Sequence, residues 1–209
     1  MATYLEGTTV KTILITMKTT TIALIALVLT SSACANEITN QKNSPSVVKI
    51  PVVEYNPSWK CPDCTPQEQY VLELIQEKTK ITDKNSLATI MGNIKQESKF
   101  ISNICEGGSR VTYNNCHVGG YGLIQWTSIG RYKGLGAFAQ KYGCDPSTLE
   151  CQTRYMINEK IFQTNLPVFE GNGQSISYYM KPAYRWLGWG IKGRREVYAY
   201  DYIKKFVWS

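Results

Sequence analysis

The segment IMGNIKQESKF, Ile90–Phe100, carries the pattern of a buried helix that ends in a carboxylate. Apolar residues recur here at the i, i+3, i+4, i+7 spacing of one helical face. They are Leu87, Ile90, Met91 and Ile94. The next position on that face belongs to Glu97. The pattern therefore predicts a helix over about residues 85–98, with an acid at the carboxyl end of its buried side.

The position of Glu97 predicts a raised pKa for its carboxyl group. Burial beside an apolar stripe disfavours the charged form, and the negative end of the helix dipole disfavours it as well. A glutamic acid that stays protonated near neutral pH can act as a general acid. The alternative is an exposed glutamate at a frayed helix end, paired with Lys95 or Lys99.

A second segment, GGYGLIQWT at Gly119–Thr127, has the composition of a sugar-binding turn. Its glycines allow sharp turns and a close approach of the backbone to a ligand. Gln125 offers a donor and an acceptor, which sugar hydroxyl and acetamido groups require. Tyr121 and Trp126 offer flat faces on which a pyranose ring could stack. The alternative is a tight turn whose aromatic side chains belong to the core.

Together, the order helix–QES-x-F, loop, G-x-G-L-x-Q-W resembles the lysozyme-like superfamily. The resemblance is closest to phage tail lysozyme-type domains, and more distant to goose-type lysozymes and soluble lytic transglycosylases. Further matching segments are GRYKGLGAFAQKYG, LECQTRYMINE and YMKPAYRWLGWGIKGRREVYAYDYI. The resemblance covers about Thr65–Phe206.

This resemblance implies a helical lysozyme-like domain with a loop-rich cleft that cleaves the bond between N-acetylmuramic acid and N-acetylglucosamine in peptidoglycan. By position, Glu97 matches the proton donor, and Gly122 and Gln125 match the substrate-contacting turn, flanked by Tyr121 and Trp126. The family brings no metal and no cofactor.

The identity of a second catalytic carboxylate stays open in the sequence. Glycosidases generally use two carboxyl groups, and the candidates are Glu106 and Glu159, each of which can equally be a solvated or structural acid. Without a second acid, the C6 hydroxyl of the sugar would be the nucleophile, as in the lytic transglycosylases. Hydrolase and transglycosylase therefore both remain possible.

The other predicted elements are also helical. Thr65 and Pro66 start a first helix, in which Glu68 occupies the capping-box position. Further helices are expected at about residues 130–142, 146–162 and 193–207, and residues 99–121 form a loop. Since no β-hairpin or repeat is evident, the predicted fold class is mainly α.

The first residues have the pattern of a targeting segment. An apolar run, Ile22–Leu29, precedes small residues that include Ala33-Cys34-Ala35, the arrangement of a cleaved secretory signal. We therefore expect an upstream extension with a signal peptide at residues 1–35, a linker or arm at 36–64, and a catalytic domain at 65–209. The expected location is the periplasm or the extracellular space, and the alternative is a virion tail.

The cysteines favour disulfide bonds. The chain has seven cysteines, and Cys34 would leave with the signal. The remaining six form three close pairs, and an even number in an exported chain is typical of disulfides. Neighbour pairing would give Cys61–Cys64, Cys105–Cys116 and Cys144–Cys151, although other connectivities remain open. No second C-x-x-C motif is present to form a zinc site.

The net charge of +7 suits a polyanionic partner without identifying it. The expected partner is bacterial peptidoglycan, with a phage tail or lysis machinery as a further possibility and membrane contact only through the signal. No nucleic acid is expected. The rival interpretation is a non-catalytic module that binds cell wall or nucleic acid through the basic, aromatic segment at residues 184–206.

Overall fold

The computed structural model describes residues 59–117 and 119–209 of the chain. This part contains seven α-helices and one two-stranded ribbon, joined by loops. The helices are α1 (Pro66–Lys78), α2 (Lys84–Ser98), α3 (Ile129–Tyr142), α4 (Leu149–Asn158), α5 (Lys160–Phe169), α6 (Ile176–Leu187) and α7 (Arg195–Lys205). A 3-10 turn, Tyr113–Asn115, lies in the long loop between α2 and α3. The predicted mainly α fold class is confirmed.

The predicted signal peptide and most of the predicted arm fall at residues 1–58, outside the described residues. Within the described part, no helix combines the length and the apolar character that crossing a membrane requires.

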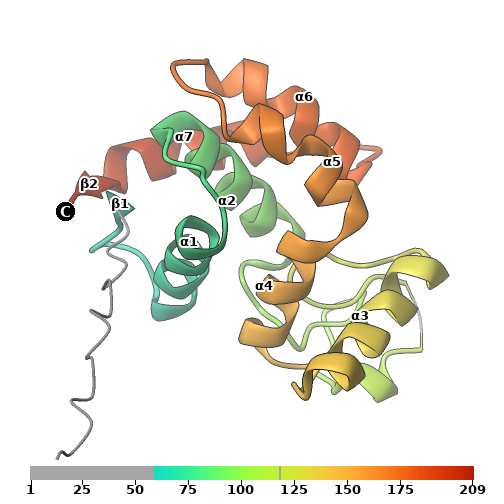
Figure 1. The fold of residues 1–209 in the computed structure, drawn as a ribbon. Coiled ribbons are helices and arrows are strands. Elements are labelled where there is room, and N and C mark those ends of the chain that lie inside the picture. The colour runs from blue at the N-terminus through green and yellow to red at the C-terminus, as the bar shows by residue number, and fades with distance from the viewer. Residues whose placement is uncertain (1–58, 118) are drawn as a thin grey trace, which may run out of the picture. The chain divides into compact units, whose positions relative to one another are not determined.

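Helix α2 has neighbours on several sides: it packs against α1, α6 and α7 (Figure 1). Its predicted apolar stripe is confirmed, because all four stripe side chains are fully buried. Gly92 faces α7 so closely that a Cβ atom there would lie 2.6 Å from the backbone nitrogen of Ala199 and 2.7 Å from the carbonyl oxygen of Arg195. Because Gly92 has no side chain, α7 can approach α2 this closely.

Capping groups start the first two helices. Thr65 caps α1, its side chain accepting from the Glu68 N–H while the Glu68 carboxylate accepts from the Thr65 N–H, so the predicted capping box is confirmed. Asp83 caps α2 by accepting from the Ser86 N–H at 2.9 Å. Both caps satisfy backbone donors that a helix start leaves unpaired.

The single helix expected at residues 146–162 is wrong, because the structure divides this region. Asp145 and Pro146 belong to a turn closed by a 3.0 Å bond from the Thr148 N–H to the Asp145 carbonyl, and α4 begins after Thr148. Glu159 then adopts an extended conformation (ψ 132°) and separates α4 from α5. Its carboxylate binds Arg131 of α3, which fixes it outside the helical path.

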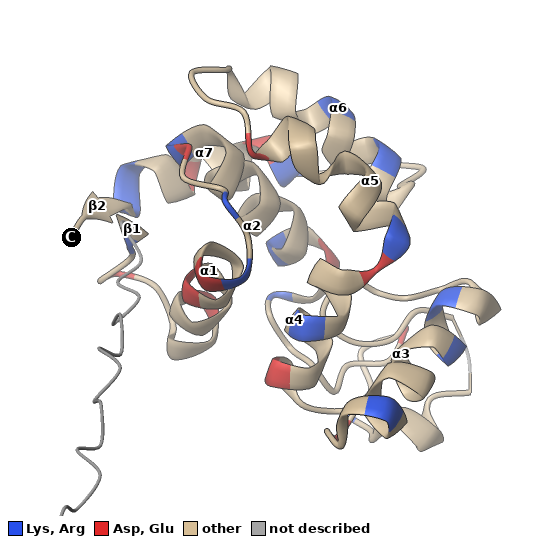
Figure 2. Cartoon of the chain, in the orientation of Figure 1, with Lys and Arg blue, Asp and Glu red and all other residues tan. Residues whose placement is uncertain are grey.

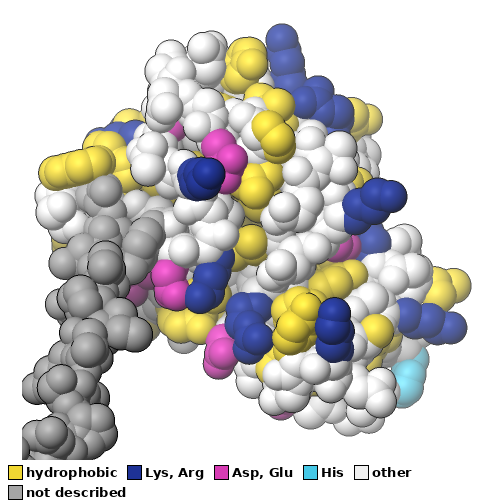
Figure 3. All heavy atoms as spheres, in the orientation of Figure 1, with side chains coloured by type: hydrophobic (Ala, Val, Ile, Leu, Met, Phe, Trp, Pro, Cys, Tyr) yellow, Lys and Arg dark blue, Asp and Glu magenta, His cyan; other side chains and the backbone are white. Residues whose placement is uncertain are grey.

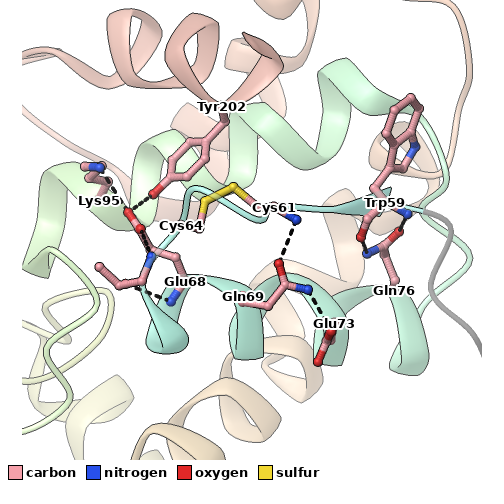
Figure 4. The surroundings of a disulfide bond; sticks show 10 residues. Trp59, Cys61, Cys64, Glu68, Gln69, Glu73, Gln76, Lys95 and Tyr202 are labelled. Atoms are coloured by element: carbon pink, nitrogen blue, oxygen red, sulfur yellow. Dashed lines mark hydrogen bonds and ion pairs between the residues drawn. A yellow bond between two sulfur atoms is a disulfide. The ribbon is translucent and has the colours of Figure 1, made fainter. Parts of the chain in front are cut away.

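A short antiparallel ribbon brings distant parts of the chain together. Strand β1 (Trp59–Lys60) pairs with β2 (Val207–Trp208), and β1 also contacts α1 through two hydrogen bonds between Trp59 and Gln76 (Figure 4). Residues 59–64, assigned to the linker from sequence, thus pack on the helices.

Three disulfide bonds staple the described chain, in the pairs that their closeness in sequence favours. They are Cys61–Cys64, Cys105–Cys116 and Cys144–Cys151. The first lies ahead of α1, as Figure 4 shows, the second closes the loop after α2, and the third joins the end of α3 to α4.

Candidate active site

The carboxyl end of α2 is anchored to the glycine-rich turn by Ser98. Its hydroxyl donates to the Leu123 carbonyl at 2.7 Å and accepts from the Phe100 N–H at 3.1 Å. Lys99 and Phe100 both have positive φ, so the chain reverses sharply there. Glu97, which precedes Ser98, is thereby held beside the turn.

The turn itself rests on a buried glutamine of α4. Gly122 has φ 71°, a conformation that favours glycine, and a Cβ there would collide with the Gln152 side chain. The Gln152 Oε1 accepts from the Leu123 N–H, and its Nε2 donates to the carbonyls of Ser102 and Pro146, each at 2.7 Å. Gly122 thus shapes the turn.

The predicted sugar-stacking roles of Tyr121 and Trp126 are wrong, because neither side chain has any exposed surface. Tyr121 packs edge-on against the rings of Tyr113 and Tyr132. Trp126 packs on Tyr155, and its indole N–H donates to Glu159 at 3.4 Å. The alternative of a tight turn with core aromatics describes both residues.

Neither candidate for a second acid faces the cleft. Glu159 is 7% exposed and binds Arg131 through both oxygens at 2.6 Å. Glu106 lies on the surface and accepts from the Gly120 N–H at 2.8 Å. Both acids hold local structure.

A cleft of about 700 Å³ lies between the end of α2, the turn, the start of α3 and the loop before α7. Its lining residues are Glu97, Ile124, Gln125, Thr127, Ser128, Arg131, Leu187, Gly188, Trp189, Gly190, Ile191 and Arg195. Among these, Glu97 is the one carboxylate. Of the predicted site residues, the structure brings Glu97 and Gln125 together in the cleft, whereas Tyr121, Gly122 and Trp126 are not among its lining residues.

Gln125 has an unusual backbone conformation and a side chain that is only partly hydrogen-bonded. Its φ of 53° is unusual for a residue other than glycine, and its Nε2 donates to the Gly122 carbonyl at 3.0 Å. No donor among the described residues binds its Oε1, which leaves an acceptor for a sugar hydroxyl or N–H group.

Glu97 is buried and ion-paired. Its side chain is 16% exposed and accepts from the guanidinium of Arg195, at the start of α7. Burial raises the pKa of the Glu97 carboxyl above its ordinary value, although the positive charges of Arg195 and Arg131 act in the opposite direction. The structure thus gives the direction expected from the sequence, with burial as the main cause.

Sequence reasoning missed the wall of the cleft formed by residues 188–192 of the loop before α7, of which Gly188, Trp189, Gly190 and Ile191 line the cleft. This cleft wall carries Trp189 and Ile191, and the Arg195 guanidinium lies 4.6 Å from the centre of the Trp189 ring. The available signal was the segment LGWG, which holds a tryptophan between glycines. Two glycines so close together disfavour a helix, and they therefore place the tryptophan between them in a loop.

The basic, aromatic segment at residues 184–206 contributes to the core as well as to the surface, where Tyr184 and Tyr200 are 54% and 50% exposed. Trp186 and Tyr202 are fully or almost fully buried. Lys and Arg positions are spread over α3, α4, α6 and α7 (Figure 2), and the face in Figure 3 shows Lys and Arg side chains among hydrophobic and uncharged groups.

The helical domain, its disulfides and a cleft with one buried carboxylate define a lysozyme-like α-helical protein. The profile of the phage tail lysozyme family matches residues 67–181, more than half of the 209 residues, so the chain belongs to that family. Searches of curated proteins and of solved structures give no significant match. Membership indicates a lysozyme-like cell-wall hydrolase in a phage-related context, either exported or virion-associated.

Proposed function

We propose that the protein cleaves the bond between N-acetylmuramic acid and N-acetylglucosamine in peptidoglycan, with Glu97 as the general acid. The observation that carries this proposal is the single carboxylate in the cleft, buried and with a raised pKa. A carboxyl group that keeps its proton towards neutral pH can protonate the oxygen of the leaving sugar.

The remaining lining groups suit a glycan. Gln125 can accept from a sugar hydroxyl or acetamido N–H, and the half-buried Trp189 offers an aromatic face in place of the two buried aromatics. Arg131 also lines the cleft, where its positive charge acts on Glu97 while both oxygens of Glu159 hold it in place.

A lytic transglycosylase is the second candidate, favoured by the lack of another carboxylate among the lining residues. After Glu97 protonates the glycosidic oxygen and the bond to C1 breaks, the C6 hydroxyl of the muramic acid attacks C1 and Glu97 takes up its proton. The product is a 1,6-anhydro sugar. If water attacks instead, the product is a reducing end.

The test is Glu97→Gln, which removes the proton donor but keeps the size of the side chain. Clearing of purified peptidoglycan should fall by roughly 10²–10⁴-fold, while thermal unfolding and binding to insoluble peptidoglycan persist. Glu106→Gln is the matched control and should stay active. Full clearing by Glu97→Gln would refute the assignment, and no clearing by the wild type would support a binding module.

Mass spectrometry of the wild-type products separates the two candidates, because 1,6-anhydro sugars and reducing ends differ by one water. The proposed organisation, with a signal at residues 1–35, an arm at 36–64 and the catalytic domain at 65–209, is tested by intact mass of the exported protein. A mass that retains residues 1–35 would refute the cleavage.

A further inference from the structure

Arg195 connects the acid of the cleft with the cleft wall, residues 188–192. The residue is 5% exposed at the start of α7. Its Nη2 donates to the Glu97 carboxylate, and its Nη1 donates to the carbonyls of Ile191 at 3.0 Å and Lys192 at 2.8 Å. Its guanidinium also lies over the ring of Trp189. One planar group therefore holds the acid, the wall backbone and the wall aromatic.

We propose that Arg195 is a positioning residue that sets the distance and orientation between Glu97 and the cleft wall, and thereby decides how a sugar is presented to the acid. The inference rests on the proposed function, because positioning Glu97 matters for catalysis only if Glu97 is the general acid. Arg195 lies beyond the segment matched by the family, which ends at residue 181.

Geometry supports this role over plain neutralisation of a buried charge. Neutralising Glu97 needs one contact, whereas Arg195 also binds two consecutive carbonyls of the wall. The wall exposes Ile191 at 84% and has glycines at 188 and 190. Its Trp189 packs edge-on against Tyr184, while the backbone at Ile191 and Lys192 is bound by Arg195. A sugar in the cleft would lie between this wall and the acid, and the guanidinium spans the same two parts.

The charge of Arg195 has a separate, measurable effect. The charged groups that act on Glu97 are Arg195 of α7 and Arg131 of α3, and both lower the pKa that burial raises. Arg131 is already bound by both oxygens of Glu159. Because the acid must be protonated to act, activity falls as pH rises through this pKa. Removal of the Arg195 charge should therefore move the alkaline limb of the activity profile to higher pH.

Arginine and lysine at this position separate the two effects. Arg195→Met removes both the positive charge and the planar guanidinium with its several N–H donors. Arg195→Lys keeps the charge, but its ammonium group cannot reproduce the planar set of contacts. Arg194→Met is the matched control, since its guanidinium lies over Tyr198 and contacts neither the acid nor the wall carbonyls.

The experiment measures kcat and KM against pH with soluble peptidoglycan fragments, on variants whose folding is checked by thermal unfolding. For Arg195→Met we expect an alkaline limb at higher pH and a rise in KM of about tenfold to 10²-fold, the penalty of misplaced binding groups. For Arg195→Lys we expect a wild-type limb and a raised KM. Arg194→Met should match the wild type in both.

An unmoved limb in Arg195→Met, or a wild-type KM in Arg195→Lys, would overturn the inference. If Arg195→Met does not fold, Arg195→Lys decides it alone through KM. These outcomes are independent of Glu97→Gln: an inactive Glu97→Gln with Arg195 variants like the wild type would leave the proposed function standing and remove the role of Arg195.

Discussion

The close approach of α2 and α7 predicts a substitution that harms catalysis more than folding. In Gly92→Ala, the new methyl would lie 2.6 Å from the Ala199 nitrogen and 2.7 Å from the Arg195 carbonyl oxygen. Ordinary contact begins at 3.4 Å, and both obstacles are backbone atoms that no rotamer change can move. Helix α7 must therefore shift away from α2.

The size of the effect follows from two opposing terms. Alanine stabilises a helix interior by about 1 kcal/mol relative to glycine, whereas overpacking destabilises a core by about 1–3 kcal/mol and sometimes more. We expect a net loss of up to about 2 kcal/mol, which lowers the melting temperature of a chain of this size by up to about 8 °C. The same shift carries Arg195 away from Glu97, and a displacement of about 1 Å can lower the rate up to 10²-fold.

Thermal unfolding and peptidoglycan clearing measure the two effects separately. Clearing should fall several-fold at temperatures where Gly92→Ala is fully folded. The matched control is Gly130→Ala in α3, because no atom lies within 4 Å of the position that its new methyl would occupy, and it should keep both stability and activity. If Gly92→Ala loses activity only in proportion to its unfolded fraction, the packing of α7 does not position the site.

Three further predictions concern the supports of the cleft. Ser98→Ala should destabilise the fold by about 1–3 kcal/mol in denaturant unfolding, because the Leu123 carbonyl loses its 2.7 Å partner; an unchanged midpoint would contradict this. Replacing both cysteines of Cys105–Cys116 by serine should cost at most about 3 kcal/mol, the value for a 15-residue loop, and a stability equal to wild type would count against it. Although burial opposes the charged form of Glu68, bonds from Tyr202, Thr65 and Lys95 hold its pKa below 4.5, so this stabilisation is present above pH 4.5 and is lost as pH falls further. Glu68→Gln should remove that part of the acid dependence of unfolding, and an unaltered dependence would refute it.

Local periodicity made the core of the fold predictable. The stripe on α2 follows from a 3.6-residue repeat within one helix, and so did the place of Glu97 at its end. The capping box at Thr65 depends on residues three apart and was equally predictable. In contrast, the break at Glu159 depends on Arg131, which lies in another helix, and helical pattern alone could not reveal it.

The site was predictable only in part, for a related reason. The sequence of the turn is the same whether its aromatic side chains face a ligand or the core, so sequence alone cannot distinguish the two. In the structure, Tyr121 and Trp126 are both buried in the core. Arg195 follows Glu97 by 98 residues, and only the α2–α7 contact brings the two together. No spacing rule links residues at such a separation.

The ribbon of β1 and β2 has a mechanical consequence. The chain enters the helices at Trp59–Lys60 and reaches Val207–Trp208 directly beside that point. A tension applied between these two segments would load their two residue pairs together with the two hydrogen bonds between Trp59 and Gln76 of α1. The ribbon and its contact with α1 therefore share such a load at a point separate from the lining residues of the cleft.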